Sequence, residues 1–180
     1  MFVLETDRLI IRKFHISDVN DVYDYAKNPN VGPNAGWKPH KNRGETIAII
    51  IEFIKSDEVW AIVEKRRNKV IGSIGLHKDR KRELRNAKMI GYVLSEDYWG
   101  KGYATEAVKR MLKYGFEELD LDLISVYHYP HNMRSRRVIE KCGFKYEGVL
   151  RKASVLYDGT VYDDVCYSMT KEDYYDMMGR

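Results

Sequence analysis

Apolar side chains recur along this chain with two different periods, one typical of helices and one typical of strands. After residue 103 they return every three or four positions, with charged residues on the opposite face, which predicts the strongest helix of the chain. Ser17-Asp18 and Asn132 are residues that favour helix starts, and Gly143 favours a helix end. Helices are therefore predicted over residues 17–27, 45–56, 104–119 and 132–143.

Strands are indicated where short apolar runs lie between turn residues. Arg66-Arg67-Asn68 and Asp158-Gly159 each separate two such runs, so both predict β-hairpins. The strand at 89–94, the helix after it and the strand at 123–129 form a parallel crossover unit. Because hairpins surround this one crossover, the fold class is predicted as a mixed α+β or α/β sheet, not a doubly wound dinucleotide fold. The predicted strands are 9–11, 59–64, 69–76, 89–94, 123–129, 144–150, 155–157 and 161–162.

Composition narrows the class of protein further. With 180 residues and no linker or repeat, we expect a single domain over 1–180. The net charge of +4 is too small for a dedicated nucleic-acid coat, and the longest apolar run, residues 47–51, is far too short for a membrane span. Acidic residues near the start argue against a signal peptide, so a cytoplasmic protein without a membrane partner is expected. Cys142 and Cys166 give neither metal-ligand spacing nor a disulfide framework, so no metal is expected.

The chemistry of the chain is concentrated in the turn before the strongest helix. Gly100 and Gly102 stand between a strand and the helix, where glycine permits unusual backbone angles and leaves room for a ligand. The unpaired N–H groups and the dipole of the helix start suit a phosphate or pyrophosphate, and Lys101 adds positive charge. The spacing fits neither a P-loop nor a dinucleotide fingerprint. By itself the motif would favour a plain glycine turn.

Two longer motifs, one of which contains this turn, indicate its function. The amino-acid sequence of residues 91–94 and 98–107 resembles the acyl-CoA motif of the GNAT N-acetyltransferase superfamily. Residues 132–144, followed by Glu147-Gly148, are similar to the second motif of that superfamily, and the opening Glu5-Thr6-Asp7-Arg8-Leu9 matches as well. The branch that this sequence resembles most is the ribosomal-protein-alanine acetyltransferase type.

The resemblance implies a splayed, mixed and mostly antiparallel sheet flanked by helices, with acetyl-CoA as co-substrate and no metal. It implies that the strand at Tyr92, Val93 and Leu94 pairs with the pantetheine arm. Many members carry Gln or Arg where Trp99 stands here, which changes little because backbone amides do most of the binding. The amides implied to hold the pyrophosphate are those of Gly100, Lys101, Gly102, Tyr103, Ala104 and Thr105.

For the reaction, the resemblance implies direct attack of an amine on the thioester in a ternary complex. It carries over Asn132 as a cofactor contact and Ser135 as a cofactor contact and hydroxyl donor to the leaving sulfur; alternatively, Asn132 is a helix N-cap and Ser135 a first-turn residue. The general base stays open, because Met89 and Ser154 occupy the positions where relatives carry an acid. Candidates are His77, His128 or ordered waters, and His77 is the residue that we expect to be catalytic.

The acceptor is a primary amine of a peptide or small molecule, which the sequence does not identify. Trp37 and His40, in a long loop between the first two helices, are candidate substrate-binding residues, or Trp37 caps the core. Two other functions remain open: a sensor that binds acyl-CoA without turnover, and a basic RNA-associated protein suggested by the charged residues 78–85, although nucleic acid is disfavoured for lack of interleaved aromatic residues. A homodimer is also left open.

Overall fold

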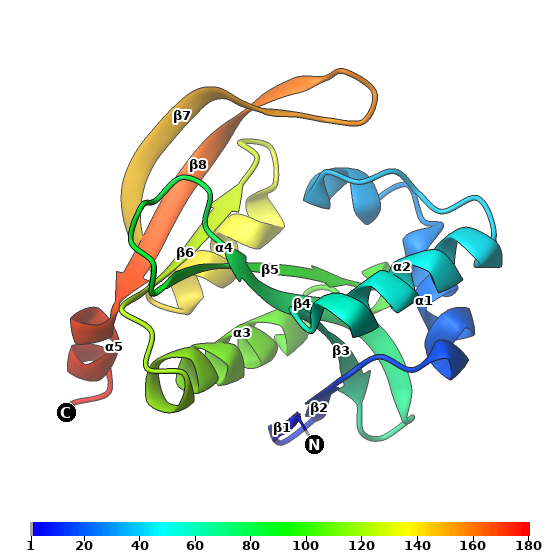
Figure 1. Cartoon of the computed structure of the whole chain (residues 1–180), viewed down its shortest axis with the longest axis horizontal. Coiled ribbons are helices and arrows are strands. Elements are labelled where there is room, and N and C mark those ends of the chain that lie inside the picture. The colour runs from blue at the N-terminus through cyan, green and yellow to red at the C-terminus, as the bar shows by residue number, and fades with distance from the viewer. Residues whose placement is uncertain (1) are drawn as a thin grey trace. The chain divides into compact units, whose positions relative to one another are not determined.

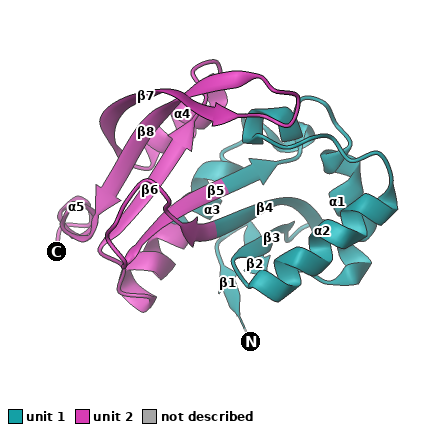
Figure 2. Ribbon diagram, turned by 45° about the horizontal axis from the view of Figure 1, so that its top comes forward, with its two compact units in different colours: residues 1–75, 92–110 teal, residues 76–91, 111–180 magenta. Residues whose placement is uncertain are grey.

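A computed structural model describes residues 2–180 of the chain, which form two compact units (Figures 1 and 2). The first unit comprises residues 1–75 and 92–110, and the second comprises residues 76–91 and 111–180. Strands β4 (Lys69–Lys78) and β5 (Ala87–Leu94) and helix α3 (Tyr103–Lys113) each begin in one unit and end in the other. The strands follow the order β1-β2-β3-β4-β5-β6-β8-β7.

In the first unit, strands β1 (Val3–Glu5), β2 (Leu9–Arg12) and β3 (Val59–Glu64) pair antiparallel with one another, and β3 pairs antiparallel with β4. Helices α1 (Val19–Ala26) and α2 (Arg43–Ser56) supply buried side chains such as Val22 and Ile50 to the same core. The hairpin predicted between residues 59–64 and 69–76 is confirmed, and β4 runs two residues further.

In the second unit, the start of β5 pairs parallel with β6 (Leu123–His128), as the crossover pattern predicted. Strand β8 (Val161–Thr170) lies antiparallel between β6 and β7 (Lys145–Val155), and the long β7–β8 hairpin turns at the predicted Asp158-Gly159. The parallel β5–β6 pairing joins Ala87–Met89 to Leu123–Ser125. The sheet is therefore mixed and mostly antiparallel, as expected.

The helices of the second unit are α4 (Met133–Lys141) and α5 (Lys171–Met177). Asn132 caps α4 and Gly143, with a φ of 87°, follows its end, as the sequence predicted. The last part of the predicted long helix is a π-helical turn over Tyr114–Glu118. Gly115 lets this turn approach β6, because a Cβ there would lie 2.6 Å from Ile124 Cδ1. Helix α5 was not predicted.

Candidate functional site

The turn before α3 has the geometry of an anion site. Gly100 and Gly102 have φ angles of +72° and +83°, a region that favours glycine, and a Cβ on Gly100 would meet no atom within 4 Å. The first bond of the helix joins the Glu106 amide to the Gly102 carbonyl, 3.0 Å apart. The amides ahead of Glu106 belong to the first turn, where helix N–H groups point outward along the axis. The two glycines thus leave a bare backbone rim at the positive end of α3.

The carboxylate of Glu106 fastens this turn to the opening residues of the chain. Its Oε1 accepts hydrogen bonds from Thr6 Oγ1 at 2.5 Å and from the Arg8 backbone N–H at 3.0 Å, and its Oε2 lies 2.7 Å from Arg8 Nε. Burial raises the pKa of Glu106, but the hydrogen bonds from Thr6 and Arg8 outweigh it, so that the pKa lies below its usual value. Glu106 is therefore an anion that holds structure and is not a proton acceptor.

The Arg8 guanidinium continues the brace on its other side. Its Nη1 donates to the Lys101 carbonyl at 2.9 Å, and its carbon lies 4.1 Å from the centre of the Tyr103 ring. Lys101, expected to offer charge to a ligand, donates its own ammonium to the Asp97 carbonyl at 2.6 Å. Thus in this structure the Lys101 ammonium is engaged by the turn itself, and binding of an anion by the backbone of this turn stays a prediction.

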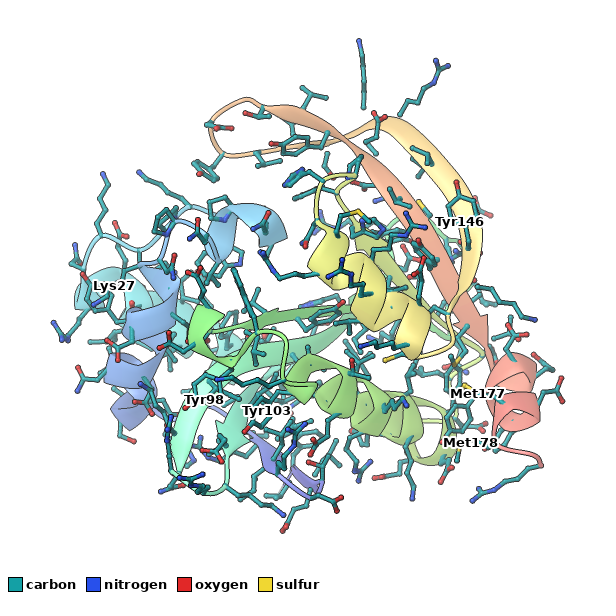
Figure 3. All side chains as sticks on the ribbon, turned by 180° about the vertical axis from the view of Figure 1, so that it is seen from behind. Lys27, Tyr98, Tyr103, Tyr146, Met177 and Met178 are labelled. Atoms are coloured by element: carbon teal, nitrogen blue, oxygen red, sulfur yellow. The ribbon has the colours of Figure 1, made fainter. Side chains whose placement is uncertain are left out.

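Aromatic residues fix the entry to the turn. Trp99 Nε1 donates to the Leu94 carbonyl at 2.8 Å, and the indole packs against the core of the first unit. The Tyr98 ring lies edge-on to Tyr103, with centroids 5.6 Å apart, and Figure 3 shows the two side by side. Trp99, where many relatives have Gln or Arg, therefore anchors the turn by packing.

The strand residues Tyr92, Val93 and Leu94, expected to face the pantetheine arm, form the end of β5. On one side this segment is closed by β4: a Cβ on Gly72 would lie 2.2 Å from the Val93 carbonyl, and the Ser95 amide donates to the Ile71 carbonyl at 2.7 Å. Gly72 thus allows the two backbones to approach closely. Pairing of this strand with a ligand stays a prediction.

The candidate acceptor residues Trp37 and His40 lie together in the first unit. Their rings are 5.4 Å apart, and Trp37 packs against the core while its ring fills the space beside Gly32. His40 Nδ1 lies 2.8 Å from Thr46 Oγ1, and burial lowers the pKa of His40. The core contact supports the capping interpretation of Trp37, and the acceptor role of both residues stays a prediction.

In the second unit, Asn132 and Ser135 occupy the first turn of α4. Asn132 Oδ1 accepts a hydrogen bond from the Ser135 amide at 3.2 Å, which confirms the capping role. The cap uses the backbone of Ser135, and its side chain is half-buried. A capping role for Asn132 and a chemical role for the Ser135 hydroxyl are therefore compatible.

His77, the candidate base, lies near the end of β4 and is half-buried. A Cβ on Gly91 of β5 would lie 3.8 Å from both Cδ2 and Nε2 of His77. The imidazole therefore packs against the β5 backbone one residue before Tyr92, the start of the strand that the resemblance assigns to the cofactor.

Two buried carboxylates of the second unit escaped the sequence analysis. Asp79, 2% exposed, accepts hydrogen bonds from Ser125 Oγ and from Tyr127 Oη, both at 2.7 Å. Burial raises the pKa of Asp79, but the hydrogen bonds, first that of Ser125, outweigh it and leave the pKa low. Because Ser125 and Tyr127 belong to β6, the charged residues 78–85 are partly fastened to that strand, and Arg82 lies 3.1 Å from Asp79 within the same segment.

The second carboxylate, Asp164, lies beside Ser154, the residue that stands where some relatives have a glutamate. Asp164 is 3% exposed and accepts from Ser154 Oγ at 2.7 Å and from Lys81 Nζ at 2.8 Å. Asp164 of β8 therefore places a carboxylate beside Ser154 of β7, the position where some relatives have a glutamate. The sequence does contain a signal for this buried acid. Asp163 and Asp164 follow the hairpin turn as neighbours in one strand, and because side chains alternate along a strand, one of the two points inward.

Cys142 and Cys166 are both buried, and burial raises the pKa of the Cys166 thiol. Such thiols are poor nucleophiles. Within residues 2–180 no group of three or more His, Cys, Asp or Glu side chains is placed to hold a metal ion. The helices of these residues are also too short or too polar to span a membrane.

Comparison with known proteins gives one consistent result. Residues 8–145 match the family model described as the acetyltransferase (GNAT) domain. The chain is 32% identical over 174 residues to the uncharacterized N-acetyltransferase YoaA of Bacillus subtilis (strain 168), covering 94% of this chain and 97% of that protein. It is 27% identical over 183 residues to the [ribosomal protein uS5]-alanine N-acetyltransferase of Escherichia coli (strain K12), covering 95% and 92%. A crystal structure of an acetyltransferase (GNAT family) from Bacillus anthracis has a TM-score of 0.85 at 28% identity, covering 95% of this chain and 99% of the other.

Proposed function

Because the chain belongs to the GNAT acetyltransferase family, we propose that it moves the acetyl group of acetyl-CoA to a primary amine by direct attack in a ternary complex. The acceptor is the N-terminus of a protein or a small-molecule amine. The similarity to a ribosomal-protein-alanine acetyltransferase supports the first of these acceptor classes.

The observation that carries this proposal is the turn at residues 100–105. Its two glycines have left-handed backbone angles, and the Gly100 position would hold a Cβ in open space. Thr6, Arg8 and Glu106 hold the first helical turn, and we assign the pyrophosphate to the backbone at its start. A rim of this kind fits acetyl-CoA, which supplies an activated thioester when bound.

The remaining steps belong to side chains of the second unit. We assign the proton lost by the attacking amine to the His77 imidazole, which is half-buried beside Gly91. The Ser135 hydroxyl donates a hydrogen bond to the sulfur, which leaves as a thiolate as the C–S bond breaks and the C–N bond forms. Neither buried cysteine is placed to form an acyl-enzyme, which favours direct attack.

The test is a screen of peptide and small-molecule amines with acetyl-CoA, in which thiol release is followed over time. Steady release that depends on an acceptor, and mass spectrometry that shows one added acetyl group on it, are the expected results. Tight acetyl-CoA binding without turnover on any acceptor would instead indicate an acyl-CoA sensor. Absence of acetyl-CoA binding would contradict the proposal altogether.

A further inference from the structure

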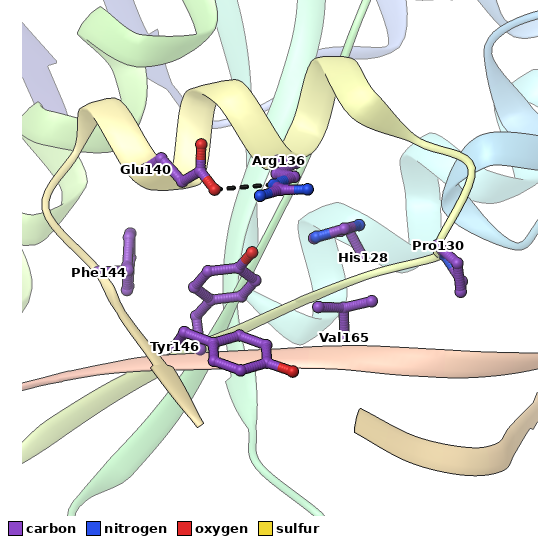
Figure 4. A pocket seen from close by; sticks show the side chains of 8 residues that line it. His128, Pro130, Arg136, Glu140, Phe144, Tyr146 and Val165 are labelled. Atoms are coloured by element: carbon purple, nitrogen blue, oxygen red, sulfur yellow. Dashed lines mark hydrogen bonds and ion pairs between the residues drawn. The ribbon is translucent and has the colours of Figure 1, made fainter. Parts of the chain in front are cut away.

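A pocket of about 420 Å³ lies in the second unit, apart from every side chain assigned above to acetyl transfer (Figure 4). Its walls come from α4, from the end of β6 and from strands β7 and β8, all of which belong to this unit. A cavity of this size suits a small organic molecule.

His128 lines the pocket and has a buried ring nitrogen without a hydrogen-bond partner within residues 2–180. The residue is 6% exposed, and its Nδ1 lies 2.7 Å from the Tyr129 carbonyl oxygen. Because a carbonyl can only accept, Nδ1 carries the proton, and Nε2 of the neutral ring is then an acceptor. Nε2 is buried and has no hydrogen-bond partner among the described residues. A buried acceptor without a donor is costly, and a ligand that donates to it would remove that cost.

The walls around His128 are aromatic. Tyr167 is 4% exposed and its ring centre lies 5.6 Å from that of His128. Tyr146 stands edge-on to Tyr167, with centres 5.5 Å apart, and Phe144 closes the same side of the pocket. Ring faces and edges at these separations favour a flat aromatic guest.

The two charged residues that line the pocket, Arg136 and Glu140, neutralise each other. Arg136 and Glu140, one turn apart on α4, form an ion pair of 2.8 Å, drawn as the dashed line in Figure 4. Both side chains are about half exposed, at 48% and 47%, so they can shift to admit a ligand. Since the pair carries no net charge, the mouth selects neither anions nor cations, and a neutral guest fits best.

We propose that this pocket binds a small neutral aromatic molecule that carries one N–H or O–H donor and gives it to His128 Nε2. The ring lies among Phe144, Tyr146 and Tyr167, and the donor is its one directional contact. This binding is independent of the proposed acetyl transfer, because neither acetyl-CoA nor an amine acceptor takes part in it.

The experiment uses indole and 1-methylindole, two rings of similar shape of which only indole has an N–H donor. Each is titrated into the full-length ¹⁵N-labelled protein, and amide shifts at β6, α4 and β8 are fitted to a dissociation constant. We expect saturable shifts at these elements and about 3- to 10-fold tighter binding of indole, as one neutral hydrogen bond gives.

Two variants test whether His128 Nε2 accepts the hydrogen bond, independently of any effect on folding. In His128→Asn the amide nitrogen can still donate to the Tyr129 carbonyl, but no atom replaces Nε2, so both probes should bind equally. In His128→Gln the amide oxygen reaches the place of Nε2, and the preference for indole should return. The proposal is overturned if indole gives no saturable shifts at the pocket, if both probes bind the wild type equally, or if His128→Asn keeps the preference.

Discussion

The Nε atom of Arg8 lies 2.7 Å from Oε2 of Glu106, an ion pair that joins the opening segment of the chain to the first turn of α3. The two side chains are 42% and 20% exposed, so the pair is only partly screened by water. Because the same carboxylate accepts from Thr6 and from the Arg8 backbone, one residue fixes the glycine turn in three directions. Thr6 and Arg8 therefore hold the turn that we propose as the anion site.

Replacing Glu106 by Gln tests this brace. The substitution keeps the shape but removes the charge, and the amide keeps its oxygen toward Thr6 and the Arg8 backbone only by turning its nitrogen, a donor, toward Arg8 Nε. We expect a loss of about 1.5–3 kcal/mol in the free energy of unfolding, typical of hydrogen bonds to a charged group, and weaker binding of acetyl-CoA. Denaturant titration and calorimetry measure the two effects.

Glu5→Gln is the matched control for this experiment. Glu5 pairs with Lys65 at 2.9 Å, but its side chain is 62% exposed, so the change should cost less than about 1 kcal/mol and leave acetyl-CoA binding unaltered. Equal effects of the two substitutions would contradict a specific role for Glu106.

The pH dependence of stability follows from the same carboxylate. Its folded-state pKa is lowered from the ordinary 4.5, so the folded protein keeps the charge longer than the unfolded chain does as pH falls. The contribution of Glu106 is therefore complete above about pH 5 and disappears as pH drops through the lowered pKa. We expect the stability difference between wild type and Glu106→Gln to be constant near neutrality and to shrink in acid. A difference that grows in acid would contradict this assignment.

The contacts of Glu106 also show where sequence reasoning reached its limit. The strand at 59–64, the start of α3 and both ends of α4 were predictable, because a hairpin turn, two glycines and the Asn132–Gly143 pair are local signals. The Arg8–Glu106 pair joins residues 98 positions apart, and no local pattern carries it. From the sequence, only the family resemblance linked the opening residues 5–9 to the acyl-CoA motif, and no contact between them was predicted.

Buried carboxylates were missed for a related reason. Asp79 stands in a run of charged residues that is typical of a solvated loop, and its burial depends on Ser125 and Tyr127, more than forty positions away. Helix α5 was missed because seven residues are too few to show a helical repeat of apolar positions, although Thr170 and Asp173 form a capping box at its start.

Replacing Gly100 or Gly102 by Ala tests the bare backbone rim. Both positions have left-handed φ angles, so each change costs about 1–2 kcal/mol of backbone strain. A Cβ on Gly102 also lies 3.4 Å from Arg8 Nη2. We expect both variants to bind acetyl-CoA at least about tenfold more weakly, measured by calorimetry.

Gly159→Ala separates strain from binding. Gly159 has a φ of +85° and an open Cβ position in the β7–β8 turn, so its strain matches that of Gly100. It should lose similar stability and keep full affinity for acetyl-CoA. If all three variants lost affinity alike, the rim would not be the binding element.

The network around Asp79 predicts a strong effect on stability. In Asp79→Asn the negative charge beside Arg82 is removed, and the amide keeps its oxygen toward Ser125 and Tyr127 only by turning its nitrogen, a donor, toward the Lys81 backbone N–H. We expect a loss of about 1.5–3 kcal/mol in the free energy of unfolding, typical of hydrogen bonds to a charged group. In Asp120→Asn the lost partner of Lys171 is 81% exposed, and less than about 1 kcal/mol should be lost. Similar losses in the two variants, measured by denaturant titration, would mean that Asp79 is not an anchor.

Ser135→Ala and His77→Gln test the roles assigned to these side chains. The cap of α4 uses the Ser135 amide, which alanine retains, so Ser135→Ala should fold with little loss of stability. If the hydroxyl stabilises the leaving thiolate by a hydrogen bond, kcat should fall about 10²-fold while binding of acetyl-CoA changes little. His77→Gln should lower kcat to a similar degree and also remove the acidic limb of the pH–rate profile, because the base is lost. An unchanged profile in His77→Gln would contradict the assignment to His77 and leave His128 or ordered waters as the proton acceptor.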